Sequence, residues 1–203
     1  MDGSRYISLA YNFWTLVRNS ISEMEKQKNQ HLVTSDYNEI ETESGIWGRY
    51  YQKTNWNDNN IGVPILFNFY HGLELYLKGL LEVAELEYED RNHKLKSLFE
   101  IIKNNEVIFT PEIIGLLKKH IYQVNEYNPF FKENNIDVNM FYSAFKYPES
   151  INGEEKYFFG DIRGKGKKTL LIYSEIKQAT IDFYNAIVKW QNKDGDFEQY
   201  LLK

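Results

Sequence analysis

Apolar residues recur at helical spacing along most of the chain, and the clearest case is residues 62–87. Gly62 and Pro64 predict the start of this helix, because proline is tolerated in a first helical turn. The stretch FNFYHGLELYLKGLLEVAEL that follows is apolar on most of its circumference. A helix of this kind packs against neighbours on two sides, so we expect it at the centre of a bundle. Its wide apolar surface also predicts self-association or docking of a partner.

The same periodicity predicts the other helices. The first spans Ser4–Asn29, and the last carries an apolar face from Ile176 to Trp190. Between them, Asp90 or Asn92 caps one helix, Thr110 caps a second that runs toward Asn128, and the stretch DVNMFYSAF forms a short helical turn. The helices at 62–87 and after Asn92 are expected to pack antiparallel.

Two regions depart from this pattern. Residues 31–60 are rich in Asn, Asp, Ser, Thr and Gly and predict a loop-rich insertion. Residues 155–173 place two apolar and aromatic runs around a glycine-rich basic turn, which predicts a small β-hairpin near the C-terminal helix. We therefore predict a single all-α domain over residues 1–203, an antiparallel helical bundle that carries this hairpin.

Composition narrows the classes of function. The chain has 203 residues, 42% of them hydrophobic, and a net charge of −5, so any contact with nucleic acid is expected to be local. It contains no cysteine, which excludes disulfides, thiolate metal sites and cysteine nucleophiles. No stretch reaches the roughly 18 apolar residues of a membrane span, and the first thirty residues lack the apolar core of a signal peptide. These features favour a cytoplasmic protein without membrane contact.

One polar stripe runs along the central helix at every third or fourth position. It consists of Asn68, His71, Glu74, Lys78, Glu82 and Glu85. We interpret the stripe mainly as the water-facing side of the helix, with Glu74 and Lys78 paired four residues apart. Alternatively, His71, Glu74 and Lys78 form a general acid–base group, because residues at this spacing share a helix face.

The turn DIRGKGKK is the best candidate for nucleic-acid contact. It concentrates basic side chains that bind phosphates by charge, namely Arg163, Lys165, Lys167 and Lys168. Alternatively, the charges serve only solubility. The aromatic residues Trp47, Tyr50, Tyr51 and Trp56 are able to stack on bases, although we expect them to pack on the core. The sequence contains no motif for a metal, a cofactor or a dinucleotide.

Three segments together resemble the HEPN superfamily of small helical bundles. They are HGLELYLKGLL, then NHKLKSLFEII, and later FKYPES before a long final helix, and the similarity covers about residues 62–190. The resemblance implies a bundle of four or five helices, frequent dimerisation, and roles in RNA cleavage, nucleotide binding, toxin–antitoxin pairs or phage defence.

The ribonucleases of this superfamily use an arginine followed, after four to six residues, by a histidine. The arginines here are Arg5, Arg18, Arg49, Arg91 and Arg163, and the histidines are His31, His71, His93 and His120. No pair has the required order and spacing, and Arg91 and His93 come nearest with one residue between them. This departure argues against inherited ribonuclease activity.

We therefore expect a non-catalytic HEPN-like binding or assembly module that forms a homodimer or binds a protein partner, in phage defence or a toxin–antitoxin system. One alternative is a divergent, metal-independent endoribonuclease that uses Arg91 and His93, with His71, across a dimer cleft. Another is the nucleotide-binding partner of a nucleotidyltransferase. We expect no cofactor, and weak RNA binding centred on the turn at 163–168.

Overall fold

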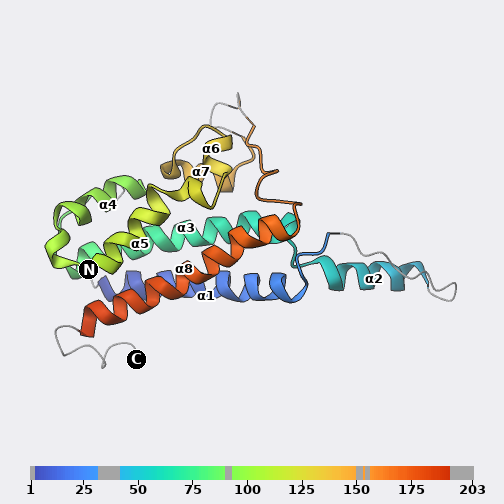
Figure 1. Ribbon diagram of the computed structural model, residues 1–203, viewed down its shortest axis with the longest axis horizontal. Coiled ribbons are helices and arrows are strands. Elements are labelled where there is room, and N and C mark those ends of the chain that lie inside the picture. The colour runs from blue at the N-terminus through green and yellow to red at the C-terminus, as the bar shows by residue number, and fades with distance from the viewer. Residues whose placement is uncertain (1–2, 32–41, 90–92, 150–152, 154–155, 193–203) are drawn as a thin grey trace.

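The computed structural model describes residues 3–31, 42–89, 93–149, 153 and 156–192, and these residues form an all-α fold (Figure 1). Its body consists of three long helices, α1 (Gly3–Lys26), α3 (Asp58–Val83) and α8 (Lys167–Asn192). Shorter helices pack beside α3 and α8: α4 (Leu95–Asn104), α5 (Pro111–Ile121), α6 (Phe130–Glu133) and α7 (Phe141–Lys146). Three 3₁₀ turns connect them: η1 (Glu106–Ile108), η2 (Val124–Glu126) and η3 (Val138–Met140). Helix α1 runs antiparallel to α3 and α8 (Figure 1).

Helix α3 is the centre of the bundle, as its apolar pattern predicted. It packs against α1, α4, α7 and α8, and every residue from 72 to 81 is buried. The apolar surface of α3 is therefore covered by this chain's own helices. Residues 72–81 of α3 therefore leave no surface for a partner, and self-association or partner docking through another helical face stays a prediction.

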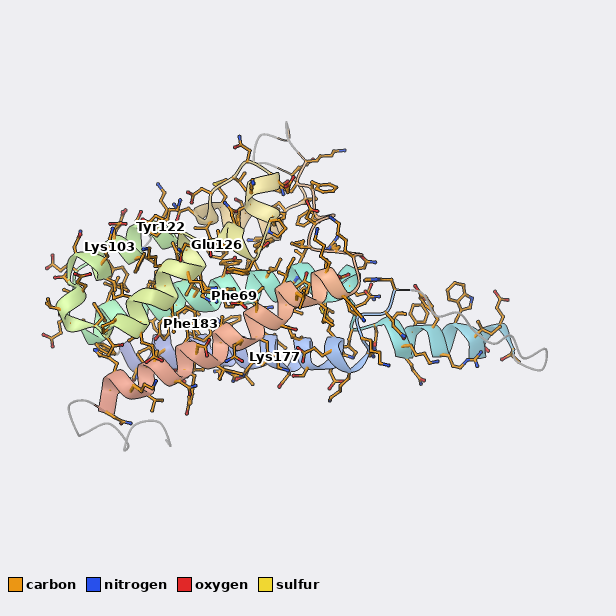
Figure 2. The ribbon with its side chains drawn as sticks, in the orientation of Figure 1. Phe69, Lys103, Tyr122, Glu126, Lys177 and Phe183 are labelled. Atoms are coloured by element: carbon orange, nitrogen blue, oxygen red, sulfur yellow. The ribbon has the colours of Figure 1, made fainter. Side chains whose placement is uncertain are left out.

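The close packing of α1 on α3 depends on Trp14 and Gly72. The indole N–H of Trp14 donates a hydrogen bond of 3.1 Å to the carbonyl oxygen of Phe69. A Cβ atom on Gly72 would lie 2.5 Å from the Trp14 Nε1 atom, so only glycine leaves room for the ring. The ring of Trp14 in turn stacks on Phe183 of α8, with centroids 5.2 Å apart, and so joins the three long helices. Phe69 and Phe183 mark this core in Figure 2.

The helix caps agree only in part with the sequence signals. The Thr110 hydroxyl caps α5 and accepts a hydrogen bond from Ile113 N, as predicted. Helix α3 begins earlier than Gly62, because Asn57 caps it through Asn60 N, and Pro64 lies within the helix. The candidate caps Asp90 and Asn92 lie outside the described residues. The helical turn predicted around Phe141 is confirmed by η3 and α7.

The composition of residues 31–60 predicted a loop, but part of the described portion, 42–60, is helical. Residues 43–54 form helix α2, which Thr42 caps by accepting a hydrogen bond from Gly45 N. Ser, Thr and Asn are favoured at helix N-caps as well as in turns, so a segment rich in them can also begin a helix. Helix α2 extends away from the end of the bundle (Figure 1).

The β-hairpin expected at 155–173 is not confirmed. Residues 167–173 belong to the first turns of α8, and the described residues of this region hold only an isolated bridge between Glu149 and Lys156. Burial of Thr169, Ile172, Tyr173 and Ile176 follows helical spacing, which outweighs the strand-like composition of KTLLIY. Gly164 and Gly166, with φ values of +72° and +54°, lead into this helix.

Among the described residues, no helix is long and apolar enough to cross a membrane.

Leu77→Asp tests the position of α3. Leu77 is fully buried, and an unpaired carboxylate at this position costs several kcal/mol, so we expect the melting temperature to fall by roughly 10 °C or more. The control Leu171→Asp places the same charge on α8, where Leu171 is 72% exposed, and should leave the melting temperature nearly unchanged. Equal melting temperatures for the two variants would contradict the central position of α3.

Candidate functional site

The most unusual polar group in the bundle is the carboxylate of Glu74 on α3. Glu74 is only 2% exposed, yet it meets three basic side chains. Its Oε1 atom lies 2.9 Å from Lys78 Nζ, one helical turn further along α3, and 2.9 Å from His93 Nδ1. Its Oε2 atom lies 3.8 Å from His71 Nδ1, which is too far for a hydrogen bond. We call these four residues the Glu74 cluster.

Our interpretation of the polar stripe as the water-facing side of α3 is wrong at its centre. Glu74 and Lys78 are 2% and 5% exposed, because α4 and α7 pack over this part of α3. The pairing of Glu74 with Lys78 is confirmed, but it is a buried ion pair and not a surface one. Burial of this pair is stable only with further hydrogen bonds, which His93 supplies from the segment before α4.

The electrostatics of the cluster favour an ionised Glu74. Burial alone would raise the pKa of this carboxyl, but its interactions with His71, Lys78 and His93 outweigh burial and lower the pKa to about 2. An ionised carboxylate only accepts hydrogen bonds, so His93 donates through Nδ1. The other ring nitrogen, Nε2, is then left for a ligand on a side chain that is 59% exposed.

Aromatic rings and one further cation border this histidine. The ring of His93 stacks on Tyr142 of α7 at 5.8 Å, and Tyr142 also contacts Phe67 at 5.9 Å. Lys146, at the end of α7, lies 5.1 Å from the centre of the Tyr142 ring. Hydrogen bonding to Tyr147 and Tyr142 raises the pKa of the Lys146 ammonium, which therefore stays charged. The result is an exposed surface with a histidine, a lysine and a planar ring.

His71 lies beside this surface but is enclosed by rings. Phe13 of α1 meets His71 edge-on at 4.7 Å, and Phe67 stacks on it at 5.9 Å. The structure thus brings His71 and His93, both candidate catalytic residues, to the same carboxylate. Arg91, the third candidate, lies outside the described residues.

The basic turn at 163–168 is less open than its sequence indicated. Lys165 forms an ion pair with Asp161, and the Arg163 guanidinium lies 5.1 Å over the Phe159 ring with its Nε atom buried. Lys167 and Lys168 are exposed. Two of the four predicted phosphate ligands are therefore already engaged within the chain, which lowers the affinity expected for the turn.

Sequence reasoning missed a second buried carboxylate, Asp58, which holds this turn. Asp58 is fully buried at the start of α3. It accepts hydrogen bonds from Asn29 Nδ2 at 2.8 Å, from Gly164 N at 2.9 Å and from the Thr169 hydroxyl, and it lies 2.6 Å from His31 Nε2. These partners come from distant parts of the chain, so no local sequence spacing predicts their contact with Asp58.

The remaining histidine belongs to the core. His120 is 1% exposed and lies 2.8 Å from the Tyr127 hydroxyl through Nδ1. Burial, with a contribution from Lys119, lowers its pKa to about 3, so it is neutral at pH 7. The part of the chain that the structure describes holds no group of three or more His, Asp or Glu residues that fits a metal ion.

Comparison with known proteins adds little to this geometry. No family model and no solved structure matches the chain. Over 115 residues, or 57% of its length, the chain is 24% identical to the polyribonucleotide nucleotidyltransferase of Karelsulcia muelleri (strain GWSS). The match spans 16% of that protein, so it shows neither a shared family nor a shared activity.

Glu74→Gln tests the electrostatic account of the cluster. The folded pKa of about 2 lies below the ordinary value of 4.5, so the stabilisation from ionised Glu74 is complete above pH 4.5 and is lost as the pH falls toward 2. We expect the variant to lose about 3 kcal/mol at pH 7, because Lys78 stays buried without its counter-ion. In thermal melts, the difference from wild type should narrow between about pH 5 and pH 2.

The control is Glu112→Gln, which breaks the exposed 3.0 Å pair with Lys189 and should cost less than about 1 kcal/mol. A difference between wild type and Glu74→Gln that stays constant from pH 7 to pH 3 would show that Glu74 is not an ionised partner of Lys78.

Proposed function

We propose that the protein is a non-catalytic binding module of the HEPN type, and that it binds RNA or a nucleotide on the surface formed by His93, Tyr142 and Lys146. We call this the His93 surface. Its chemistry fits a phosphate beside a planar base. A phosphate accepts hydrogen bonds, so the form of His93 that binds it is the imidazolium, in which Nδ1 donates to Glu74 and Nε2 donates to the ligand. The Lys146 ammonium adds positive charge, and the exposed ring of Tyr142 supplies a stacking face.

The single observation that carries this proposal is the buried carboxylate of Glu74. It holds Nδ1 of His93 at 2.9 Å and leaves the outer part of the ring exposed. A histidine fixed in this way presents Nε2 in one orientation, so less conformational entropy is lost when a ligand binds. Burying a carboxylate and a lysine only to orient an exposed histidine is costly, and a binding surface explains that cost.

The three segments that resemble the HEPN superfamily all contribute residues to the Glu74 cluster or to the His93 surface beside it. The first supplies Glu74 and Lys78, the second His93, and the third Lys146, which lies over Tyr142. Their convergence supports the HEPN interpretation. With that interpretation comes a role in bacterial phage defence or in a toxin–antitoxin system.

His93→Gln and Lys146→Gln test the binding surface. Each variant should weaken the binding of a fluorescent single-stranded RNA about tenfold in anisotropy titrations, because each removes one charged or hydrogen-bonding phosphate contact worth about 1.4 kcal/mol. The double variant Lys167→Gln/Lys168→Gln removes two lysines from the 163–168 turn, one more than Lys146→Gln, and should still weaken binding less than threefold. The opposite ranking would move the nucleic-acid site to the turn, as the sequence predicted.

A divergent ribonuclease is a second candidate, and the contact between Glu74 and His93 is the observation that favours it. A carboxylate that orients a histidine through one nitrogen prepares the other nitrogen for general acid–base catalysis. Against it stands the single residue between Arg91 and His93 in the sequence.

Incubation with mixed RNA in the presence of EDTA separates the two functions. We expect no cleavage by wild-type protein above the level of the His93→Gln variant, because the arginine–histidine spacing of the ribonucleases is absent. Cleavage by wild type that disappears in both His93→Gln and Arg91→Ala, while RNA binding persists, would establish the ribonuclease instead.

A further inference from the structure

Among the described residues, the contacts that join helix α2 to the bundle lie in its C-terminal half, where the Tyr50 hydroxyl also donates to His31 O. At its C-terminal end, Gln27 Nε2 donates to Gln52 O at 2.8 Å and to Asn55 Oδ1 at 2.9 Å, and Asn60 Nδ2 donates to Thr54 O. Thr54 is the only buried residue of the helix. At about 1.5 Å per residue, its 12 residues carry Glu43 roughly 18 Å from this anchor. Figure 2 shows the side chains of α2 extending outside the bundle.

The exposed side of this arm carries an uncharged stripe with two large rings. Ser44, Trp47, Gly48, Tyr51 and Asn55 follow the spacing of one helix face, and all five are exposed. Trp47 is 51% exposed and Tyr51 is 61% exposed, with ring centroids 6.2 Å apart. The other side of α2 is half-buried at Ile46, Arg49 and Tyr50, so the stripe is the side of the arm on which a partner can pack, and packing there would stabilise a short helix.

We propose that this stripe is an interface between two copies of the protein, in which the two α2 helices pack antiparallel about a two-fold axis. The stripe is self-complementary, because a neutral aromatic surface can pack on a second copy of itself. In such a pair, Trp47 of one copy lies beside Tyr51 of the other, and Gly48 lies near the crossing point. A Cβ at Gly48 would meet nothing within 4 Å, so the helix backbones are open to close approach there.

The distribution of charge favours a second copy over a nucleic acid. Arg49 and Lys53 lie, by helical spacing, on the side of α2 opposite the stripe, so a nucleic acid stacked on Trp47 and Tyr51 would gain no phosphate contact from them. The stripe itself is neutral, and a neutral aromatic face is typical of the centre of a protein interface.

Antiparallel packing also places opposite charges together at both ends of the pair. The outer end of each arm carries Glu43 and reaches the base of the other arm. At that base, Asp58 holds the turn that bears Lys165, Lys167 and Lys168, through the hydrogen bond from Gly164 N. The acidic end of one arm thus meets the basic turn of the second copy. This contact gives the exposed lysines a partner other than RNA.

Sedimentation velocity tests the pairing. Two short helices bury less than the roughly 1,200 Å² of a standard interface, so the dimer should be weak. We therefore expect the protein to change from monomer to dimer as its concentration rises from about 1 to 200 μM. Trp47→Glu should weaken association at least tenfold without changing the melting temperature, because α2 lies outside the bundle. The control Leu171→Glu, at a 72% exposed position on α8, should associate like wild type. Wild type that stays monomeric at 200 μM overturns the proposal.

Charge exchange and cross-linking test the antiparallel arrangement. Glu43→Lys and Lys167→Glu/Lys168→Glu should each weaken association, and combining the three changes in one chain should restore it.

Because the natural chain has no cysteine, Gly48→Cys introduces a single thiol that should cross-link two copies under mild oxidation. Ser44→Cys should not, since an antiparallel pair holds these positions roughly 12 to 15 Å apart along its axis. Equal cross-linking of Ser44→Cys indicates parallel helices and overturns the proposal. RNA binding lost in Trp47→Glu with association unchanged would make the stripe an RNA surface instead.

Discussion

The contact of Trp14 with Gly72 sets the architecture of this bundle. Because Gly72 has no side chain, the indole lies directly against α3, donates to the Phe69 carbonyl and stacks on Phe183 of α8. Close approach of α1 to one side of α3 leaves the other sides for α4, α7 and α8. A central helix enclosed in this way has no water-facing side along its middle turns. Its polar residues there must therefore find partners inside the protein or lie at a surface that other elements shape.

Glu74 shows the consequence of that enclosure. Its carboxylate is buried among Lys78, His93 and His71, so the cost of desolvation is offset by ionic hydrogen bonds. His93 belongs both to this cluster and to the His93 surface, so the orientation of an exposed imidazole depends on a carboxylate in the interior. Under the proposed function, ligand binding and stability are coupled at this place. A change in the packing around Glu74 also changes the orientation of His93.

The sequence was sufficient for the elements whose signals are local. The all-α class, the Thr110 cap and the burial of Leu77 follow from periodicity and capping chemistry. It was insufficient where distant elements decide the outcome. A stripe at helical spacing is the same whether water or α7 covers it, so the burial of Glu74 could not be predicted. The run KTLLIY has the composition of a strand, and only its position on the bundle makes it the start of α8. Trp47 and Tyr51 were expected on the core, but they lie on a helix that leaves the core altogether.

The two ends of the excursion that contains α2 are joined at its base. Asn29 and Asp58 exchange two hydrogen bonds of 2.8 Å, one from the Asn29 amide and one from the Asp58 backbone N–H. The polypeptide leaves and re-enters the bundle at nearly the same point. The junction of Asn29 with Asp58 therefore fixes the distance between the end of α1 and the start of α3, and the excursion itself does not have to fix it. An exposed connection closed at its base in this way is the kind of site where chains tolerate insertions.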